Sequence, residues 1–144
     1  MRPVDFEIAA IMENLERAKW AALPLRLVMG TILSVAGYMK LVAMAGTIEY
    51  FAKQGFPIPV ATAWFITLLE LCGGIALILG LFVRHLGLLY TIEFIVAAFW
   101  VKLPTQGYIG ARLDLMLIAG AAALFILGAG RWSIDSAWLE KRKR

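Results

Sequence analysis

Four long apolar runs decide what this chain can fold into. They cover residues 23–41, 60–81, 86–100 and 113–127. A hydrocarbon core about 30 Å thick takes about 20 helical residues to cross. In lipid, only helices and closed barrels satisfy every backbone polar group, and these runs are too long and too continuous for barrel strands. They predict an all-α protein, an integral membrane four-helix bundle.

The composition agrees with a membrane protein of one compact domain. Hydrophobic residues make up 62% of the 144 positions, and the mean hydropathy is +0.81. A soluble domain is usually closer to half apolar. Because Cys72 is the only cysteine, the chain can form neither an intrachain disulfide nor a dithiol pair.

Residues 1–22 form a separate N-terminal segment ahead of the first run. Their acidic residues are not expected in a cleaved signal peptide, which begins with basic residues. An apolar stripe at helical spacing consists of Ile8, Ile11, Met12 and Leu15, and the opposite face carries Glu13, Asn14, Glu16 and Arg17. Two interpretations stay open: an amphipathic helix lying in the headgroup layer, and a solvated helical tail.

The basic residues predict the orientation in the membrane. With both termini in the cytoplasm, the cytoplasmic side holds Arg2, Arg17, Lys19, Arg84, Arg131 and the basic run 141–144, and the other side holds Lys40, Lys53, Lys102 and Arg112. This excess favours cytoplasmic termini. Four spans agree with that orientation, because an even number of spans places both termini on the same side. Residues 131–144 are therefore interpreted as a basic cytoplasmic tail after a membrane domain over 23–130. No nucleic-acid partner is expected.

The connections between the runs differ in character. A break at 55–59 precedes the second helix, and residues 47–54 can form a short interfacial helix before it. Only a tight turn fits between the second and third helices. Residues 102–110 carry Pro104 and Gly107 and are predicted to form a loop.

Polar residues inside the spans are the functional candidates, because charges in the membrane usually face the protein interior. Arg26, Gly30, Gly37 and Lys40 fall on one stripe of the first helix. The small residues on it allow a neighbouring helix to approach closely, and the two cations then point into the bundle.

Three carboxylates lie on the other helices. Glu70, which is followed by Gly73 and Gly74, lies near the membrane centre; depth along the helices predicts a pair with Lys40 rather than Arg26. Glu93 lies at similar depth and either transfers protons or holds one in a hydrogen bond. Asp114 is expected to form an interfacial salt bridge with Arg112.

The sequence has no motif of its own for a cofactor or metal. His85 is the only histidine, so bis-histidine haem ligation is excluded, and one cysteine cannot hold an iron–sulfur cluster. Neither a Walker loop nor a dinucleotide fingerprint is present. If the protein takes part in redox chemistry, the cofactor is expected to be lipid-soluble or to belong to a partner.

A series of short motifs runs in order through the last 120 or so residues. The motifs are Arg26-x-x-x-Gly30, Gly37-x-x-Lys40, Phe51 with Gly55-x-Pro57, Glu70-x-x-Gly73-Gly74, Gly80-x-x-x-Arg84 and Gly128-x-Gly130-x-x-Ser133-x-Asp135. Together they resemble the DoxX family of four-helix proteins of prokaryotic cytoplasmic membranes. The family takes its name from a subunit of a thiosulfate:quinone oxidoreductase.

This resemblance implies a small subunit or companion of a membrane oxidoreductase that acts at quinone. Whether the chain is itself an enzyme stays open. Glu70 and Glu93 would handle protons, Lys40 or Arg26 would stabilise a quinone oxyanion, and Asp114 would orient that cation. The expected partners are lipid and other membrane subunits, or further copies of the chain. The alternative is a structural subunit or assembly factor without chemistry.

Overall fold

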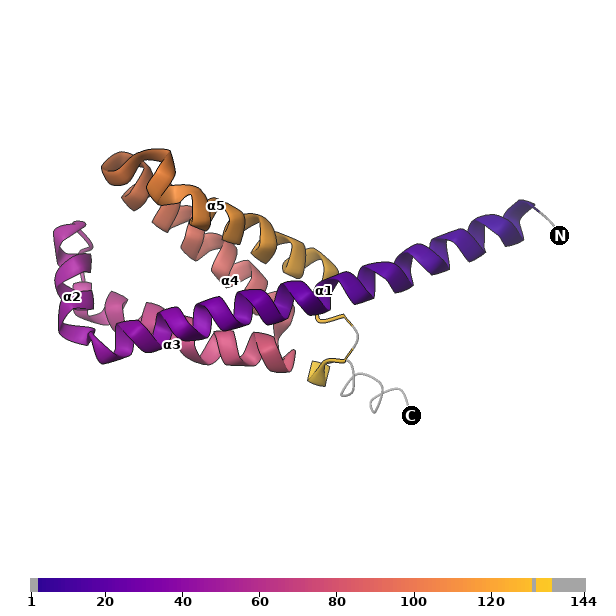
Figure 1. Cartoon of the computed structure of the whole chain (residues 1–144), viewed down its shortest axis with the longest axis horizontal. Coiled ribbons are helices and arrows are strands. Elements are labelled where there is room, and N and C mark those ends of the chain that lie inside the picture. The colour runs from indigo at the N-terminus through magenta and orange to yellow at the C-terminus, as the bar shows by residue number, and fades with distance from the viewer. Residues whose placement is uncertain (1–2, 131, 136–144) are drawn as a thin grey trace.

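The computed structural model describes residues 3–130 and 132–135, and every regular element in this part of the chain is helical. The elements are α1 (Pro3–Val42), α2 (Met44–Lys53), α3 (Pro59–Leu79), α4 (Val83–Ile95), the π-helix η1 (Val96–Lys102) and α5 (Leu103–Leu127) (Figure 1). Three apolar helical stretches, over 7–42, 59–79 and 83–127, are long enough to cross a membrane. The prediction of an all-α membrane bundle is confirmed.

The third stretch contains two crossings. Its 45 residues would form a helix about 67 Å long, more than twice the hydrocarbon thickness. Gly107 interrupts it with φ 64° and ψ −164°, a backbone conformation that essentially only glycine adopts. The chain reverses there, so that α4 and α5 run side by side (Figure 1). Both ends of the described chain therefore lie at the same end of the bundle.

The predicted loop over 102–110 is wrong in its extent. The π-helix η1 continues to Lys102 and α5 begins at Leu103, so that helical backbone surrounds the single non-helical residue Gly107. Pro104 lies in the first turn of α5, where its missing N–H is not needed. A sharp reversal thus takes the place of an open loop. The short helix predicted over 47–54 appears as α2.

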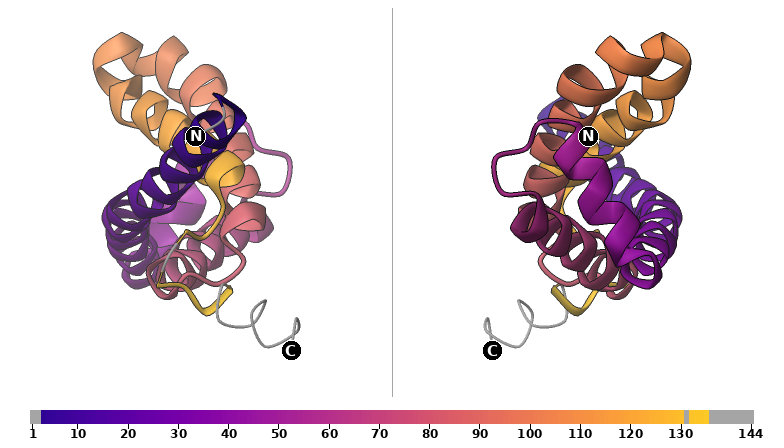
Figure 2. Two further views of the ribbon diagram at one scale, coloured as in Figure 1. Left: turned by 90° about the vertical axis from the view of Figure 1, so that its right-hand side faces the viewer. Right: turned by 90° about the vertical axis from the view of Figure 1, so that its left-hand side faces the viewer.

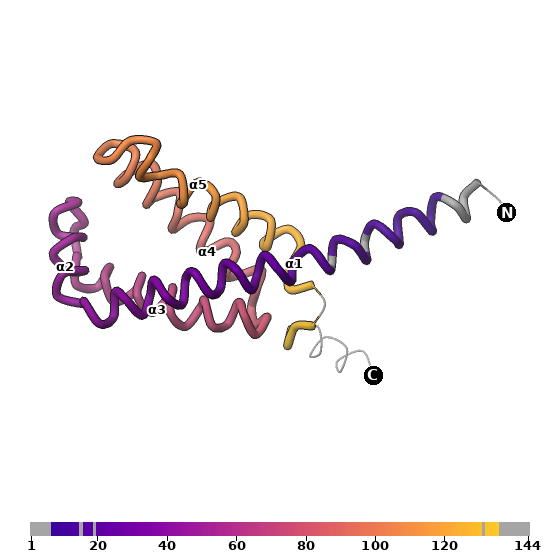
Figure 3. Tube along the Cα trace, in the orientation of Figure 1, coloured from indigo at the N-terminus to yellow at the C-terminus, as the bar shows by residue number. Residues whose placement is uncertain are grey.

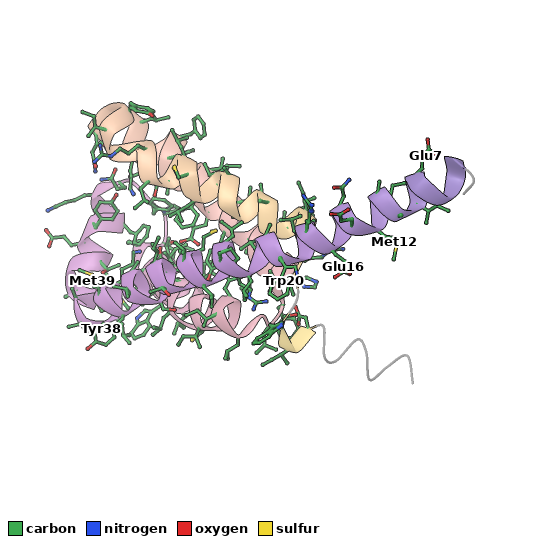
Figure 4. All side chains as sticks on the ribbon, turned by 45° about the vertical axis from the view of Figure 1, so that its right-hand side comes forward. Glu7, Met12, Glu16, Trp20, Tyr38 and Met39 are labelled. Atoms are coloured by element: carbon green, nitrogen blue, oxygen red, sulfur yellow. The ribbon has the colours of Figure 1, made fainter. Side chains whose placement is uncertain are left out.

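The N-terminal segment is helical and continues directly into the first span. Helix α1 has 40 residues and passes through Pro24, so the boundary after residue 22 is not a helix boundary. Figure 4 shows Glu7 and Met12 on the part of α1 that extends beyond the other helices. Its position relative to the headgroups stays a prediction. The side chains of Leu15 and Lys19 lie outside the described part, as do Arg2, Arg131 and the basic run 141–144.

The bundle consists of two packed helix pairs. Helix α1 packs along α3 and α4 packs along α5, whereas α3 and α4 make little direct contact. Figure 2 looks along the bundle and shows α4 and α5 on one side of the molecule and α1 and α3 on the other. Helix α2 stands across the end of the bundle away from the termini (Figure 3).

Glycines bring the backbones of α1 and α3 into contact. A Cβ atom on Gly30 would lie 2.7 Å from the carbonyl oxygen of Gly74, and a Cβ atom on Gly74 would lie 2.6 Å from the backbone nitrogen of Ser34. A Cβ atom on Gly37 would overlap the backbone of Leu71. Such spacing gives close van der Waals packing between helices in a membrane.

Glycines also lie at the contact within the second helix pair and at the contact between the two pairs. On α4, a Cβ atom on Gly87 would lie 2.7 Å from the backbone nitrogen of Phe125 on α5. Gly73 faces α4, where a Cβ atom would collide with the hydroxyl of Tyr90. The structure therefore places Gly30, Gly37, Gly73 and Gly74 at helix–helix contacts.

The segment after α5 closes the end of the bundle nearest the termini. Arg26 is 1% exposed and donates hydrogen bonds to the carbonyl oxygens of Ala129 (2.5 Å) and Trp132 (2.8 Å). The carboxylate of Asp135 accepts hydrogen bonds from the backbone N–H groups of Phe82 (3.1 Å) and Val83 (3.2 Å). Asp135 thus satisfies donors at the start of α4 that the helix cannot satisfy itself.

Candidate functional site

A cavity of about 750 Å³ lies at the end of the bundle away from the termini. Residues of α1, α2, α3, α4, η1 and α5 form its walls, and most of the lining side chains are apolar. Five charged residues also line it, and they are called here the charged cluster: Lys40, Glu70, Glu93, Lys102 and Asp114. Each of α1, α3, α4, η1 and α5 contributes one of these side chains.

Lys40 and Glu70 form an ion pair across the α1–α3 interface. Lys40 lies in the last turn of α1 and donates a hydrogen bond to Oε2 of Glu70. The Glu70 side chain is 5% exposed and that of Lys40 is 31% exposed. This is the pair that the depth of the two residues along their helices predicted. The hydroxyl of Tyr90 donates a 2.8 Å hydrogen bond to the carbonyl oxygen of Leu69, so α4 also holds the turn that carries Glu70.

Lys102 and Asp114 form a second ion pair, which connects η1 to α5. The Nζ of Lys102 lies 2.9 Å from Oδ1 and 2.7 Å from Oδ2 of Asp114. The expected pair of Asp114 with Arg112 is wrong. Residues two apart on a helix point to different faces, whereas the reversal at Gly107 brings Lys102 alongside Asp114.

Glu93 is the carboxyl group of the cluster without a lysine of its own. It lies on α4, close enough to Glu70, Lys40 and Asp114 to interact with their charges. Its Oε2 atom is buried and has no hydrogen-bond partner among the described residues. Each lysine pairs with another carboxylate, Lys40 with Glu70 and Lys102 with Asp114. The cluster as a whole contains three carboxyl groups and two ammonium groups.

Arg26 does not belong to this site. It is bonded to Ala129 and Trp132 at the other end of the bundle, about 21 Å along α1 from Lys40. The structure therefore excludes Arg26 as an alternative partner for Glu70. It also shows Asp114 paired with Lys102, whereas the resemblance implied that Asp114 would orient Lys40 or Arg26.

Two features of the site escaped the sequence analysis. Lys102 was counted only as a charge outside the membrane, although it and Asp114 lie at similar distances along the chain on either side of Gly107. The π-helix η1 left no recognised pattern. Such helices are rare and occur frequently at functional sites, and this one carries Lys102 and Val101 into the wall of the cavity.

Comparison with known proteins identifies the family. A family model described as DoxX matches residues 21–103, more than half of the chain. The chain belongs to the DoxX family. The matched residues include Lys40, Glu70, Glu93 and Lys102, whereas Asp114 and the motif over 128–135 lie beyond them.

Two curated relatives of this DoxX-family chain cover most of its length. "Putative oxidoreductase CatD" of Bacillus subtilis (strain 168) is 33% identical over 111 residues, which are 77% of this chain and 81% of the relative. "Inner membrane protein YphA" of Escherichia coli (strain K12) is 30% identical over 118 residues, 76% of this chain and 84% of the relative. No solved structure gives a significant match.

Proposed function

We propose that this DoxX-family protein is a small subunit or companion of a membrane oxidoreductase and that its cavity binds quinone. The supporting observation is an apolar cavity of about 750 Å³ whose wall carries two lysines and a buried carboxyl oxygen without a partner. Pockets for small ligands usually measure about 300–1,000 Å³ and combine apolar walls with a few polar groups. The relative named as an oxidoreductase supports the same reaction class.

The residues present fit a quinone ring. Tyr50, Phe51, Phe56, Phe65 and Phe94 line the cavity, and aromatic side chains pack well against a flat ring. Lys40 and Lys102 are charged donors for the ring oxygens, and each is positioned by its own carboxylate. A charged donor of this kind stabilises negative charge that develops on an oxygen.

The proposed chemistry is the conversion of a quinone to a quinol, which takes up two electrons and two protons. The electrons would come from a redox centre on a partner subunit. Glu93 and Glu70 are the proton-handling groups, and Glu93 is the better placed because no lysine neutralises it. A carboxyl group that gives its proton within such a site acts as a general acid.

We also propose that the protein lies in the cytoplasmic membrane with both termini inside. The distribution of basic residues supports this orientation, and the relative named as an inner membrane protein supports the compartment. The charged cluster would then lie toward the outer half of the bilayer.

The alternative role is a structural subunit or assembly factor. The observation that favours it is that both lysines already have carboxylate partners, so the pairs can hold helices together without a ligand. An ion pair of this kind can specify a unique helix arrangement.

Quinol formation by the complex that copurifies in mild detergent tests the proposal. Glu93→Gln keeps the size of the side chain but removes its proton, so we expect quinol formation to fall by about 10²-fold, the usual contribution of a general acid. Glu49→Gln, at an exposed carboxylate on α2, is the control and should leave the rate unchanged. A complex that retains full activity after removal of this chain would support the structural role instead.

A further inference from the structure

The sparse contact between α3 and α4 and the exposed side chains that line the cavity there point to a sideways opening between these two helices. These helices are joined by a tight turn after Leu79 and make little contact elsewhere. Phe65 on α3 and Leu89, Ile92 and Val96 on the α4 side line the cavity and are also 40–59% exposed. These four residues are called here the mouth. Their spacing of three and four residues on the α4 side places Leu89, Ile92 and Val96 on one face of the helix, together with Glu93.

The mouth lies at the depth of the hydrocarbon core. All four residues fall within apolar stretches long enough to cross the membrane, over 59–79 and 83–127. Phe65 is about 9 Å along α3 from Pro59. Because the mouth consists only of apolar side chains, it suits contact with acyl chains rather than with water.

The side of the cavity that faces the aqueous phase is covered by α2. Helix α2 stands across this end of the bundle (Figure 3) and contributes Thr47, Tyr50 and Phe51 to the wall. Phe51 is buried and packs edge-on against Phe56, with ring centroids 5.1 Å apart. The cavity therefore has polar groups within, a cover toward water and an apolar opening toward lipid.

From this arrangement we propose that the ligand is a long-chain amphiphile whose polar ring lies at the charged cluster and whose apolar tail leaves through the mouth into the bilayer. The inference rests on the proposed function and specifies its substrate as a quinone with an isoprenoid tail. Because Phe65 and Ile92 face acyl chains at this depth, an isoprenoid tail in the mouth replaces one apolar contact by another and stays in an apolar environment along its whole length.

Binding of two quinones to the purified protein in lipid nanodiscs tests this inference. One probe is a long-chain isoprenoid ubiquinone, and the other is the same ring without a tail. In Ile92→Trp the larger side chain occupies the mouth, so we expect affinity for the long-chain quinone to fall at least about tenfold. The ring alone needs no space there, and its affinity should change by less than about threefold. Ile95→Trp, on the same helix, 43% exposed and outside the cavity lining, is the matched control.

The outcomes separate this inference from the proposed function. Equal affinity of Ile92→Trp and Ile95→Trp for the long-chain quinone would overturn the position of the tail, as would equal losses for the two probes in Ile92→Trp. In both cases quinone binding by the wild type would still stand. If the wild-type protein binds neither probe, the proposed function fails and this inference fails with it.

Discussion

Replacing Lys40 by methionine is expected to destabilise the bundle by about 3–5 kcal/mol, the usual cost of removing one partner of a buried ion pair. The Glu70 carboxylate, 5% exposed, would be left in a low-dielectric interior without its cation. Glu70→Gln should also be destabilising, because Lys40 would lose its charged acceptor. Reversible unfolding in mixed micelles measures both losses.

The double variant distinguishes a specific pair from two separate effects. Because the two residues share one interaction, the double change should cost clearly less than the sum of the single changes. Lys53 and Glu49 provide the matched control pair, since they form an exposed ion pair within α2. Their coupling should be about 0.5 kcal/mol or less. Strictly additive losses for Lys40 and Glu70 would show that the pair does not hold α1 to α3.

Gly37→Ala is expected to have a large effect for a change of one methyl group. The added Cβ atom would overlap the backbone of Leu71, so the two helices would have to separate. Overpacking usually costs about 1–3 kcal/mol, and a collision with backbone should reach the upper part of this range.

Gly46→Ala is the matched control for this change. Nothing lies within 4 Å of a Cβ atom at Gly46, and alanine is the better helix former by up to about 1 kcal/mol. The melting temperature in detergent should therefore fall for Gly37→Ala and stay level or rise for Gly46→Ala. Equal melting temperatures would mean that the α1–α3 contact is not tight at Gly37.

Much of the bundle and one half of the charged cluster could be predicted from the sequence. Run length alone gives the spans, because the thickness of the bilayer fixes how many helical residues are needed. The pair of Lys40 with Glu70 follows from depth, since antiparallel helices with a fixed rise per residue bring known levels together.

The remaining features depend on the three-dimensional arrangement of the helices, which residue spacing in the sequence does not specify. Asp114 was assigned to its near neighbour Arg112, but the reversal at Gly107 brings Lys102 of η1 beside Asp114 instead. Arg26 shares a stripe with Lys40, yet its partners are backbone carbonyls of the segment after α5, which hydrophobic periodicity cannot place. The sequence separated residues 1–22 from the first span by their amphipathic pattern, but a change of pattern does not interrupt a helix, and α1 continues through this point.

Quinone binding to a variant with a filled cavity tests the central claim most directly. Gly46 lines the cavity with open space at its Cβ position, so Gly46→Trp should fill the site without disturbing helix packing. Titration of long-chain ubiquinone into nanodiscs should give one saturable site per wild-type chain and none in Gly46→Trp, at an unchanged melting temperature. Identical saturable binding by the two proteins, or only unsaturable partitioning into lipid with the wild type, would contradict the assignment of this cavity as a quinone site.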